Sequence, residues 1–409
     1  MTKPYVLGFV GENANGILRW WIEQILAGFS RHGLEYKLID LQGNWRDPLL
    51  EALGQRNPEF CFSFQGFGMD FKTNGENFWS KSNIPFFAYL GDSPYYRPAL
   101  HAAEGPGLYL LYSCQDFLET YRDVMGGKTF ASVVRYGYPA NDRADRIAWS
   151  NRPYDTVFVK TGIDPARIQL EWDVLPRVTQ QILHESAAEV LSGSNETIAA
   201  ICRAAFERHN LHCGSQRELL LYVCCSIDRY ARAKRAERMV QNLMRHDVLI
   251  VGDWSHLDRS DARARFAPAL PGSQLDALYA ESKIVVNTSP SVRHGIHERI
   301  MAGLRAKSAV LSDSTPHLQR ALADCPAFLG LDIDAADFPD QLDATLAATL
   351  ADPDMPAKVA ASANEAARLF SMESFIDVIM EHVHLEAHRR SVVGWTFPPF
   401  DASAPARTQ

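Results

Sequence analysis

The segment with the clearest chemistry lies at residues 287–313, where a loop of Ser, Arg, His and Gly separates an apolar run from a helical pattern. The loop, residues 289–295, leads into a predicted helix that begins near Ile296. Open backbone N–H groups and the helix dipole make such an N-terminus a site for anions. Arg293 and His294 stand beside it, where they could contact a diphosphate.

Glu298 is the acidic residue at the start of this predicted helix. Ile296, Ile300 and Leu304 recur at i, i+4 and i+8 and predict its buried stripe. Glu298 lies off that stripe, so we expect its side chain to point into a binding cleft. A carboxylate there can accept hydrogen bonds from both hydroxyls of a ribose, as an acidic residue does in dinucleotide-binding folds.

The elements that must position this segment alternate between strand and helix along two stretches of the chain. The strands predicted in the first stretch lie at 5–10, 36–40, 58–64, 85–90, 107–113 and 130–136, and those of the second at 154–160, 248–254, 283–290, 308–313 and 327–331. Such alternation indicates βαβ units and parallel sheets. We therefore predict an α/β fold with two Rossmann-like domains facing each other across a cleft.

The domain boundaries follow from changes in this pattern. We predict an N-terminal domain at 1–145 and a C-terminal domain at 146–370, joined by a polar linker at 141–152. The second domain carries a helical insertion at about 165–245. A C-terminal helix and tail at 371–409 are expected to cross back to the first domain.

Polar residues follow several strands of the first half. Ligands of open α/β sheets bind at the carboxyl ends of the strands, which makes these positions candidates. Asp92 could act as a base toward a hydroxyl group, and capping of a short helix is the alternative. Gln65 and Tyr136 are strand-end candidates of the same kind. Asn13 and Asn15 offer hydrogen bonds from the loop GENANG, where a capping role is again the alternative.

Three further candidates lie in the second half. Gly252 and Asp253 end the apolar run VLIV of the strand at 248–254. Asp228 lies on the preceding helix beside Arg229. It could serve as a carboxylate in the cleft, or even as a nucleophile, and an ion pair within its helix is the alternative.

Metal and dinucleotide motifs are absent from the sequence. His297 and Glu298 begin like HExxH, but the fifth residue is Met301. Asp332 and Asp334 formally make a DxD motif, which we interpret as a cap after a short strand. The loop GENANG is not GxGxxG. We therefore expect neither a bound metal nor a cofactor.

Composition limits the remaining classes. The chain has 409 residues, of which 46% are hydrophobic and 22% charged, as in a soluble globular protein. A net charge of −8 argues against binding to a nucleic-acid backbone. The seven cysteines have no framework spacing and predict reduced thiols in a cytoplasmic protein. No apolar stretch approaches the roughly 20 residues of a membrane span.

Residues 287–313 resemble the donor-binding motif of glycosyltransferases with the GT-B fold, in particular the family-4-like group that includes the CgeB-like glycosyltransferases. Those proteins carry a strand ending in Asn, a Gly-containing loop, a Glu-Arg helix and a strand ending in Asp. Three other segments match family motifs, namely IPFFAYLGDSP at 84–94, the Arg-containing helix at 228–244 and VLIVGDW at 248–254. The resemblance implies an acceptor-side N-terminal domain, a C-terminal domain that binds a nucleotide-sugar donor, and metal-independent, retaining transfer.

The resemblance also assigns roles to residues. Glu298 would bind the donor ribose, and Gly295 with its neighbouring amides would bind the diphosphate. The other donor-side candidates are Ser289, Arg293, His297, Arg299, Gly252 and Asp253. The catalytic candidates are Asp92, Asp228 and His294, and the acceptor-side candidates are Asn13, Asn15, Gln65 and Tyr136.

Several alternatives stay open. The family's second Glu, seven residues before Glu298, is replaced by Ser291. This leaves room for a transferase of a CMP-activated, Kdo-like acidic sugar in which Asp228 is catalytic. A GT-B epimerase, a catalytically silent sugar-binding or assembly protein and, last, an oxidoreductase are further alternatives. The acceptor is expected to be a bacterial surface glycan or a protein. The aromatic residues at 395–400 are expected to pack on the first domain, and a peripheral membrane contact through them stays open.

Overall fold

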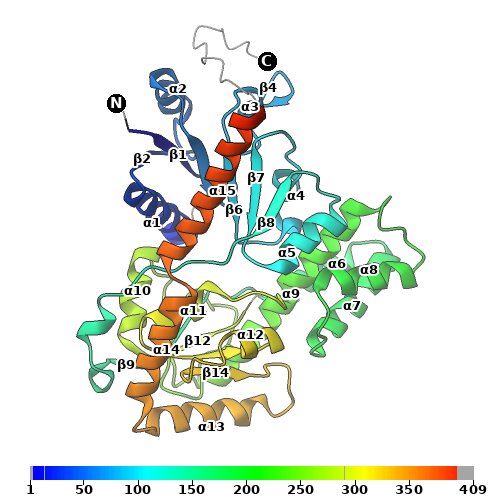
Figure 1. Ribbon diagram of the computed structural model, residues 1–409. Coiled ribbons are helices and arrows are strands. Elements are labelled where there is room, and N and C mark those ends of the chain that lie inside the picture. The colour runs from blue at the N-terminus through cyan, green and yellow to red at the C-terminus, as the bar shows by residue number, and fades with distance from the viewer. Residues whose placement is uncertain (1–2, 13, 290, 394–409) are drawn as a thin grey trace. The chain divides into compact units, whose positions relative to one another are not determined.

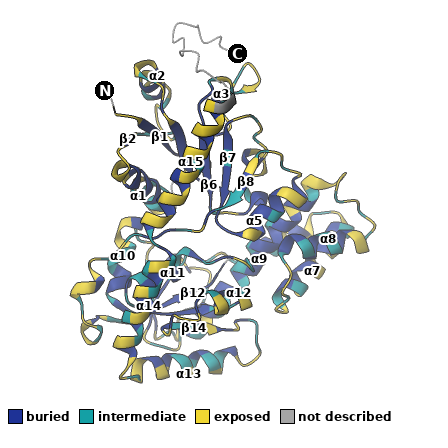
Figure 2. Cartoon of the chain, in the orientation of Figure 1, coloured by how far each residue is buried: buried dark blue, intermediate teal, exposed yellow. Residues whose placement is uncertain are grey.

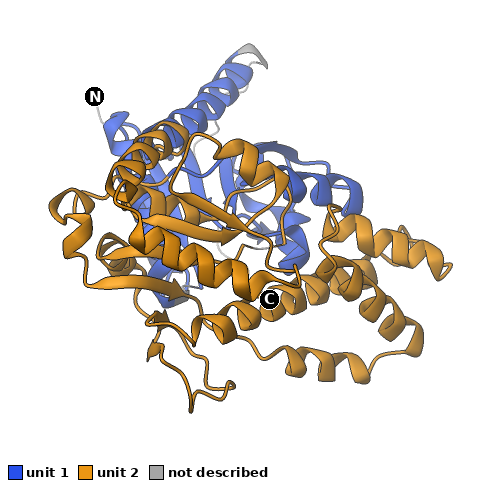
Figure 3. Cartoon of the chain, turned by 90° about the horizontal axis from the view of Figure 1, so that it is seen from below, with its two compact units in different colours: residues 1–137, 372–409 blue, residues 138–371 orange. Residues whose placement is uncertain are grey.

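The computed structural model describes residues 3–12, 14–289 and 291–393. The chain divides into two compact units (Figure 3), which we call unit 1, residues 1–137 with 372–409, and unit 2, residues 138–371. Each unit is built around one six-stranded sheet whose strands are all parallel. The predicted α/β class with two Rossmann-like halves is confirmed.

The sheet of unit 1 has the strand order β2-β1-β3-β6-β7-β8 (Figure 1). Its strands are β1 (Tyr5–Val10), β2 (Glu35–Asp40), β3 (Phe60–Phe64), β6 (Phe86–Leu90), β7 (Leu108–Tyr112) and β8 (Phe130–Val133). A short antiparallel hairpin, β4 (Lys72–Thr73) with β5 (Glu76–Asn77), stands apart from it. Because β1, β3 and β6 are neighbours, the loops after these three strands meet at one edge of the sheet.

The helices of unit 1 cover this sheet. They are η1 (Ala14–Gly16), α1 (Ile17–Arg31), α2 (Arg46–Gln55), α3 (Phe78–Lys81), η2 (Pro94–Tyr96), α4 (Pro98–His101), α5 (Gln115–Glu119), the π-helical η3 (Thr120–Val124) and α15 (Met372–Val393). Trp21, Ile25 and Phe29 of α1 recur every four residues and are buried, which gives α1 one apolar face. Figure 2 shows the same division, with buried strands and helices exposed on their outer faces.

The C-terminal helix α15 belongs to unit 1 although it is more than 200 residues from the rest of that unit in sequence. It packs against α1. Its buried Glu386 accepts a hydrogen bond of 2.5 Å from Arg390 Nε, and Arg390 Nη1 donates to the carbonyl of Asn83. Tyr109 OH and Arg389 also donate to Glu386. The hydrogen bond from Arg390 to Asn83 attaches the helix to the loop before β6, and the one from Tyr109 attaches it to β7. The predicted tail at 395–400 lies outside the described residues.

The sheet of unit 2 has the strand order β11-β10-β9-β12-β13-β14. Its strands are β9 (Tyr154–Val159), β10 (Leu249–Val251), β11 (Arg265–Ala267), β12 (Ser282–Asn287), β13 (Ala309–Asp313) and β14 (Phe328–Leu331). The helices outside the insertion are η4 (Ala144–Arg146), η5 (Trp149–Asn151), α10 (Gly272–Ala280), α11 (Glu298–Arg305), α12 (Pro316–Ala321), α13 (Phe338–Ala351) and α14 (Met355–Leu369).

Four helices form the insertion between β9 and β10, namely α6 (Pro165–Asp173), α7 (Arg177–Leu191), α8 (Ile198–Arg208) and α9 (Arg217–Leu243). Their extent agrees with the helical block expected at 165–245. Helix α9 contacts the other three. Trp172 of α6 is fully buried and donates its indole N–H to Ser226 Oγ of α9 at 2.7 Å. The insertion is therefore a small helical bundle joined to the sheet through α9.

The division between the units falls at residues 137–138, whereas the sequence pattern placed it at 145 with a linker at 141–152. The polar side chains of that stretch pair with unit 2. Asn141 Nδ2 donates to the carbonyl of Asp276, and Arg143 pairs with Glu281. Buried Arg152 donates to the carbonyls of Ser282 and Ala306. A polar composition predicts exposure, but these groups are satisfied by backbone carbonyls and carboxylates of a distant segment.

Among the described residues, no helix combines the length and apolarity that crossing a membrane requires.

We predict that Arg390→Met destabilises unit 1 by about 3–5 kcal/mol, because it leaves the buried carboxylate of Glu386 without its main partner. Arg389→Met is the matched control. Its guanidinium also contacts Glu386 but is half exposed, so the cost should stay below about 1 kcal/mol. Urea denaturation at pH 7 measures both. Equal losses in the two variants would show that burial of the pair does not anchor α15.

Candidate functional site

The carboxyl edge of the unit 2 sheet gathers polar residues from adjacent strands. Lys160 follows β9, Gly252 follows β10, Thr288 follows β12 and Asp313 ends β13. In a parallel sheet with this order these ends lie side by side. Only Gly252 of these four was predicted as a site residue.

Lys160 is the centre of this edge. Its Nζ donates to Thr288 Oγ1 at 3.0 Å, which ties β9 to β12. Burial lowers the pKa of Lys160 well below its usual value, and the nearby charges of Arg232 and Arg299 lower it further, whereas Asp313 and Asp228 oppose the change. The edge therefore has an excess of positive charge around a partly buried cation.

Gly252 allows the close approach of two chain segments beside Lys160. Its φ is 133°, and a Cβ at this position would lie 2.3 Å from the Lys160 carbonyl oxygen. Trp254 Nε1 donates to that same oxygen at 2.6 Å. Asp253, by contrast, is exposed and accepts the backbone N–H of Ser255. That hydrogen bond lowers its pKa, and Asp253 is engaged in its own turn.

Asn287 positions Arg299 at the end of β12. The Asn287 side chain is fully buried, and its Oδ1 accepts a hydrogen bond from Arg299 Nη1 at 3.0 Å. Its Nδ2 donates to Ser289 Oγ and Ser312 Oγ. The backbone N–H of Ser289 donates to Asp313 Oδ1 at 2.6 Å, and burial raises the pKa of that carboxyl. The buried amide thus fixes one predicted cation at the strand edge.

His297 and Glu298 form the start of α11. His297 is the N-cap, and its Nδ1 accepts the backbone N–H of Arg299 at 3.3 Å. An accepting Nδ1 leaves the proton on Nε2, which lies 3.1 Å from Glu298 Oε2. Burial lowers the pKa of His297 well below its usual value, helped by Arg299, Arg232 and Lys160. A neutral imidazole therefore holds the Glu298 carboxylate, whose side chain is 35% exposed. The helix begins two residues later than the pattern predicted.

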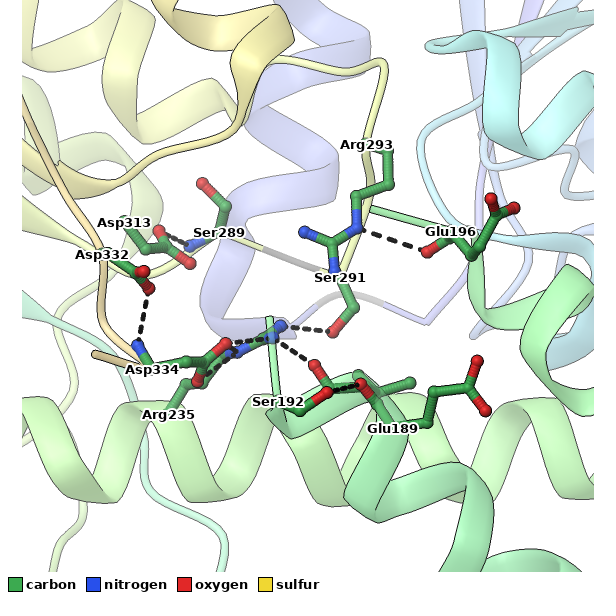
Figure 4. Close-up of polar contacts among 11 residues, drawn as sticks. Glu189, Ser192, Glu196, Arg235, Ser289, Ser291, Arg293, Asp313, Asp332 and Asp334 are labelled. Carbon is green, nitrogen blue, oxygen red and sulfur yellow. Dashed lines mark hydrogen bonds and ion pairs between the residues drawn. The ribbon is translucent and has the colours of Figure 1, made fainter. Parts of the chain in front are cut away.

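The described side chains of the loop before α11, residues 289–295, point in different directions. Gly295 is buried, whereas His294 is exposed and meets the ring of His317 edge-on at 6.0 Å. Arg293 Nε donates to the carbonyl of Glu196 at 3.3 Å (Figure 4), so this side chain extends toward the turn before α8. Gly295 is the loop residue nearest in sequence to the N-cap His297, which it precedes by two residues.

An ion pair between Arg235 and Asp334, next to Ser291 of this loop, was not predicted. Arg235 of α9 contacts both oxygens of Asp334, with the shortest distance 2.6 Å, and donates to Ser291 Oγ (Figure 4). It also donates to the carbonyl of Val190. Asp332 Oδ1 accepts the backbone N–H of Asp334, as expected for a turn-capping role. The second Asp of the DxD motif instead binds the helical insertion to the sheet.

Asp228 and Arg232 lie one turn apart on α9. Asp228 is 3% exposed, and its carboxylate lies 3.8 Å from Arg232 Nη1. Arg229, its sequence neighbour, pairs with Glu171 of α6 instead. The ion pair within the helix that was weighed as the alternative for Asp228 is therefore present, with Arg232 as the partner. The pair also contributes to the charge environment of Lys160.

Unit 1 brings three of its four described candidates together. Gln65 Nε2 donates to Asp92 Oδ2 at 2.9 Å, and Gln65 Oε1 accepts the backbone N–H of Gly91. A Cβ at Gly91 would lie 2.0 Å from Tyr136 OH, so only glycine fits between these groups. Asn15 has a left-handed conformation with φ of 49° in the loop after β1. Asn13 lies outside the described residues.

The sequence analysis gave no role to Lys160, Arg232, Arg235, Asn287 or Asp313, and it gave Asp334 a capping role. Lys160 and Asp313 directly end apolar runs, and a systematic search of every strand end would have found them. Arg232 and Arg235 follow Asp228 by four and seven residues, the spacing of one helix face. Among the described residues, no group of three or more His, Cys, Asp or Glu side chains could hold a metal ion.

We predict that His297→Asn reduces the acid sensitivity of unit 2. The folded-state pKa of His297 lies below the unfolded value of about 6.5, so its contribution to stability is full above pH 6.5 and is lost as the pH falls. Asn keeps the cap but cannot titrate. Between pH 6.5 and 5.5 the wild type should lose about 1 kcal/mol more than the variant in urea denaturation. Equal losses would mean that His297 is protonated in the folded state.

Residues 232–374 match a family model described as glycosyl transferase-like. That segment contains Arg232, Gly252, Asn287, Glu298 and Asp313. No curated protein matches the sequence.

Three solved structures share the fold of the whole chain. A glycosyltransferase from Rickettsia africae is 10% identical with a TM-score of 0.53, and the match covers 95% of this chain and 99% of that one. HepE from Anabaena, in complex with UDP and glucose, is 12% identical with a TM-score of 0.51, covering 93% and 99%. AviGT4, a glycosyltransferase of avilamycin A biosynthesis, is 13% identical with a TM-score of 0.50, covering 97% and 100%. At these identities the likeness shows the fold alone.

Membership of the CgeB-like group stays a prediction. Residues 232–374 are similar to the glycosyl transferase-like family, and the whole chain has the fold of these GT-B glycosyltransferases.

Proposed function

We propose that this protein transfers a sugar from a nucleotide-sugar donor to a glycan or protein acceptor, with retention of configuration and without a bound metal. The observation that carries the proposal is the N-terminus of α11, where neutral His297 holds the Glu298 carboxylate beside the cations around Lys160. The complex of the similar HepE with UDP and glucose supports a nucleotide-sugar donor.

The charge at the carboxyl edge of unit 2 suits a diphosphate. Lys160, Arg232 and Arg299 lie close enough to influence one another, and burial makes their mutual repulsion costly. A bound diphosphate would relieve that repulsion and favour the protonated form of Lys160. When the donor reacts, negative charge grows on the departing diphosphate, and cations already in place stabilise it. This supplies the electrostatic role that a divalent metal fills elsewhere.

Glu298 is proposed to bind the donor ribose. It is the first residue of α11, so its carboxylate lies beside the open backbone N–H groups of the helix. Its contact with His297 Nε2 fixes one oxygen and leaves the partly exposed group able to accept further hydrogen bonds. Gly295, buried just before the cap, leaves the backbone next to it accessible to a phosphate.

The acceptor is proposed to bind at the carboxyl edge of the unit 1 sheet. Gln65, Asp92 and Tyr136 offer an amide, a carboxylate and a phenol around Gly91, a set of groups that can hydrogen-bond sugar hydroxyls. Asp92 would accept the proton of the acceptor hydroxyl. The free thiols of all seven cysteines suit the reducing cytoplasm, where we place the activity.

One observation favours a second candidate function. Ser291 stands where the resembled family has a second Glu, and its hydroxyl accepts a hydrogen bond from Arg235, which is already paired with Asp334. No carboxylate is supplied at that position of the loop. A CMP-activated acidic sugar as donor, with buried Asp228 as the catalytic carboxylate, would suit this departure.

We predict that one of UDP, GDP, dTDP, ADP and CMP raises the melting temperature of the protein. At 100 times Kd a ligand adds about 2.7 kcal/mol, which corresponds to a shift on the order of 5 °C for a unit of this size. Glu298→Ala should abolish most of the shift, because the ribose loses its acceptor. Thermal denaturation followed by dye fluorescence measures both, and release of the same nucleotide from its sugar conjugate checks the activity.

Glu373→Ala is the matched control, since Glu373 is also an acidic residue in the first turn of a helix but lies in unit 1. It should lower the melting temperature as Glu298→Ala does and leave the nucleotide shift intact. A shift with CMP alone would select the acidic-sugar donor. The proposed donor site is wrong if no nucleotide shifts the wild type or if Glu298→Ala binds as well as the control.

A further inference from the structure

A pocket of about 510 Å³ lies in unit 1 at the amino ends of β7 and β8, away from Gln65 and Asp92 at the carboxyl edge. Its walls are the loop before β7, the loop before β8 and one face of α15, which contributes His382, Leu385, Glu386 and Arg389. None of the roles derived above uses this pocket.

The apolar part of the pocket is unusually exposed. Phe130 is 53% exposed and Leu385 is 67% exposed, although both are large hydrophobic residues. The Phe130 ring lies edge-on to Tyr109 at 5.4 Å and to His382 at 6.2 Å. His382 is held in turn by Ser132 Oγ and the Val378 carbonyl. The ring is therefore fixed in place while much of its surface stays in water.

The charged part of the pocket is left with positive charge. Buried Glu386 accepts hydrogen bonds from Arg390, Arg389 and Tyr109 OH, and the two guanidinium groups carry one positive charge more than this carboxylate. Lys128 and Arg389 at the exposed wall then face one further carboxylate, Glu104. An occupant that combines aromatic side chains with a negative charge would complement this lining.

We propose that residues 395–401 of this chain, WTFPPFD, bind in this pocket. The segment has three aromatic residues, two prolines and then Asp401. Its aromatic side chains would cover Phe130 and Leu385, and Asp401 would meet Lys128 or Arg389. The prolines limit the conformations of the free segment and so lower the entropy lost on binding.

The length of the chain allows this binding within one molecule. Helix α15 ends at Val393, and Leu385 lies eight residues earlier, about 12 Å along the helix axis. Seven or eight extended residues span about 25 Å, so residues 395–401 can turn back and reach the pocket. Gly394, the first residue after α15, is the type that most readily permits such a reversal. Attachment in the same chain gives an effective concentration in the millimolar range.

The test compares the full chain with a full-length variant in which Trp395, Phe397 and Phe400 are all changed to Ala. A fluorescent peptide with the wild-type sequence of residues 394–409 is added in trans. Because the wild-type tail competes from within the chain, the peptide should bind the triple variant at least about tenfold more tightly than the wild type. Fluorescence anisotropy measures both affinities. Amide hydrogen exchange at residues 104–107 and 127–129 should be faster in the triple variant.

Leu385→Lys, introduced into the triple variant, should abolish peptide binding. Leu170→Lys is the matched control, because Leu170 is 65% exposed on α6 of unit 2. Equal peptide affinity for the wild type and the triple variant, or unchanged binding after Leu385→Lys, would overturn the proposal. So would a dimer of the wild type that the triple variant lacks, since the pocket would then hold the tail of a second copy. Nucleotide binding in unit 2 is measured separately, so this test stands whatever the donor result.

Discussion

A partly buried lysine at the carboxyl end of β9 is the constraint around which unit 2 is arranged. Removing an ammonium group from water is costly unless polar groups surround it. Thr288 accepts its hydrogen bond, Asp313 and Asp228 lie near, and Arg232 and Arg299 add positive charge. Asp228 and Arg232 lie on α9 and the other groups on three further segments, so the register of the sheet and the position of α9 must both be correct for Lys160 to be tolerated. Incomplete charge balance at this edge is what suits it to an anionic substrate.

Buried polar groups in the rest of the molecule are likewise paired with partners from other segments. In unit 2, Asn287 uses its amide to hold Arg299 and two serines, and Arg235 joins the helical insertion to the sheet through Asp334. In unit 1, Glu386 and Arg390 attach α15 to the loop before β6. Arg235 with Asp334 and Arg390 with the Asn83 carbonyl join segments that are remote in sequence, and loss of either arginine would leave a carboxylate without that partner. These interactions favour one arrangement of helices and strands, whereas apolar packing by itself would allow several similar arrangements.

Residue patterns predicted the parts of the site that depend on local structure. The strand, loop and helix around residues 287–305 follow from the apolar period and from glycine, and they place Glu298 at the start of α11. The N-cap role of neutral His297 was not predicted. A residue pattern does not show which imidazole nitrogen accepts the hydrogen bond from a backbone N–H. Arg293 illustrates the limit, since it stands beside the helix start in sequence but extends toward Glu196 in space.

The sequence by itself determined the α/β class and the two Rossmann-like halves, and it predicted a helical block and a helix near Glu298. All of these depend on hydrogen bonds and apolar periods within a few turns of chain. Only the tertiary structure decided that residues 141–152 pack on unit 2, that Arg235 meets Asp334 across 99 residues, and that Lys160 is partly buried among charges. Whether a charged side chain is exposed or paired depends on which distant groups the folded chain brings to it, and no local pattern carries that information.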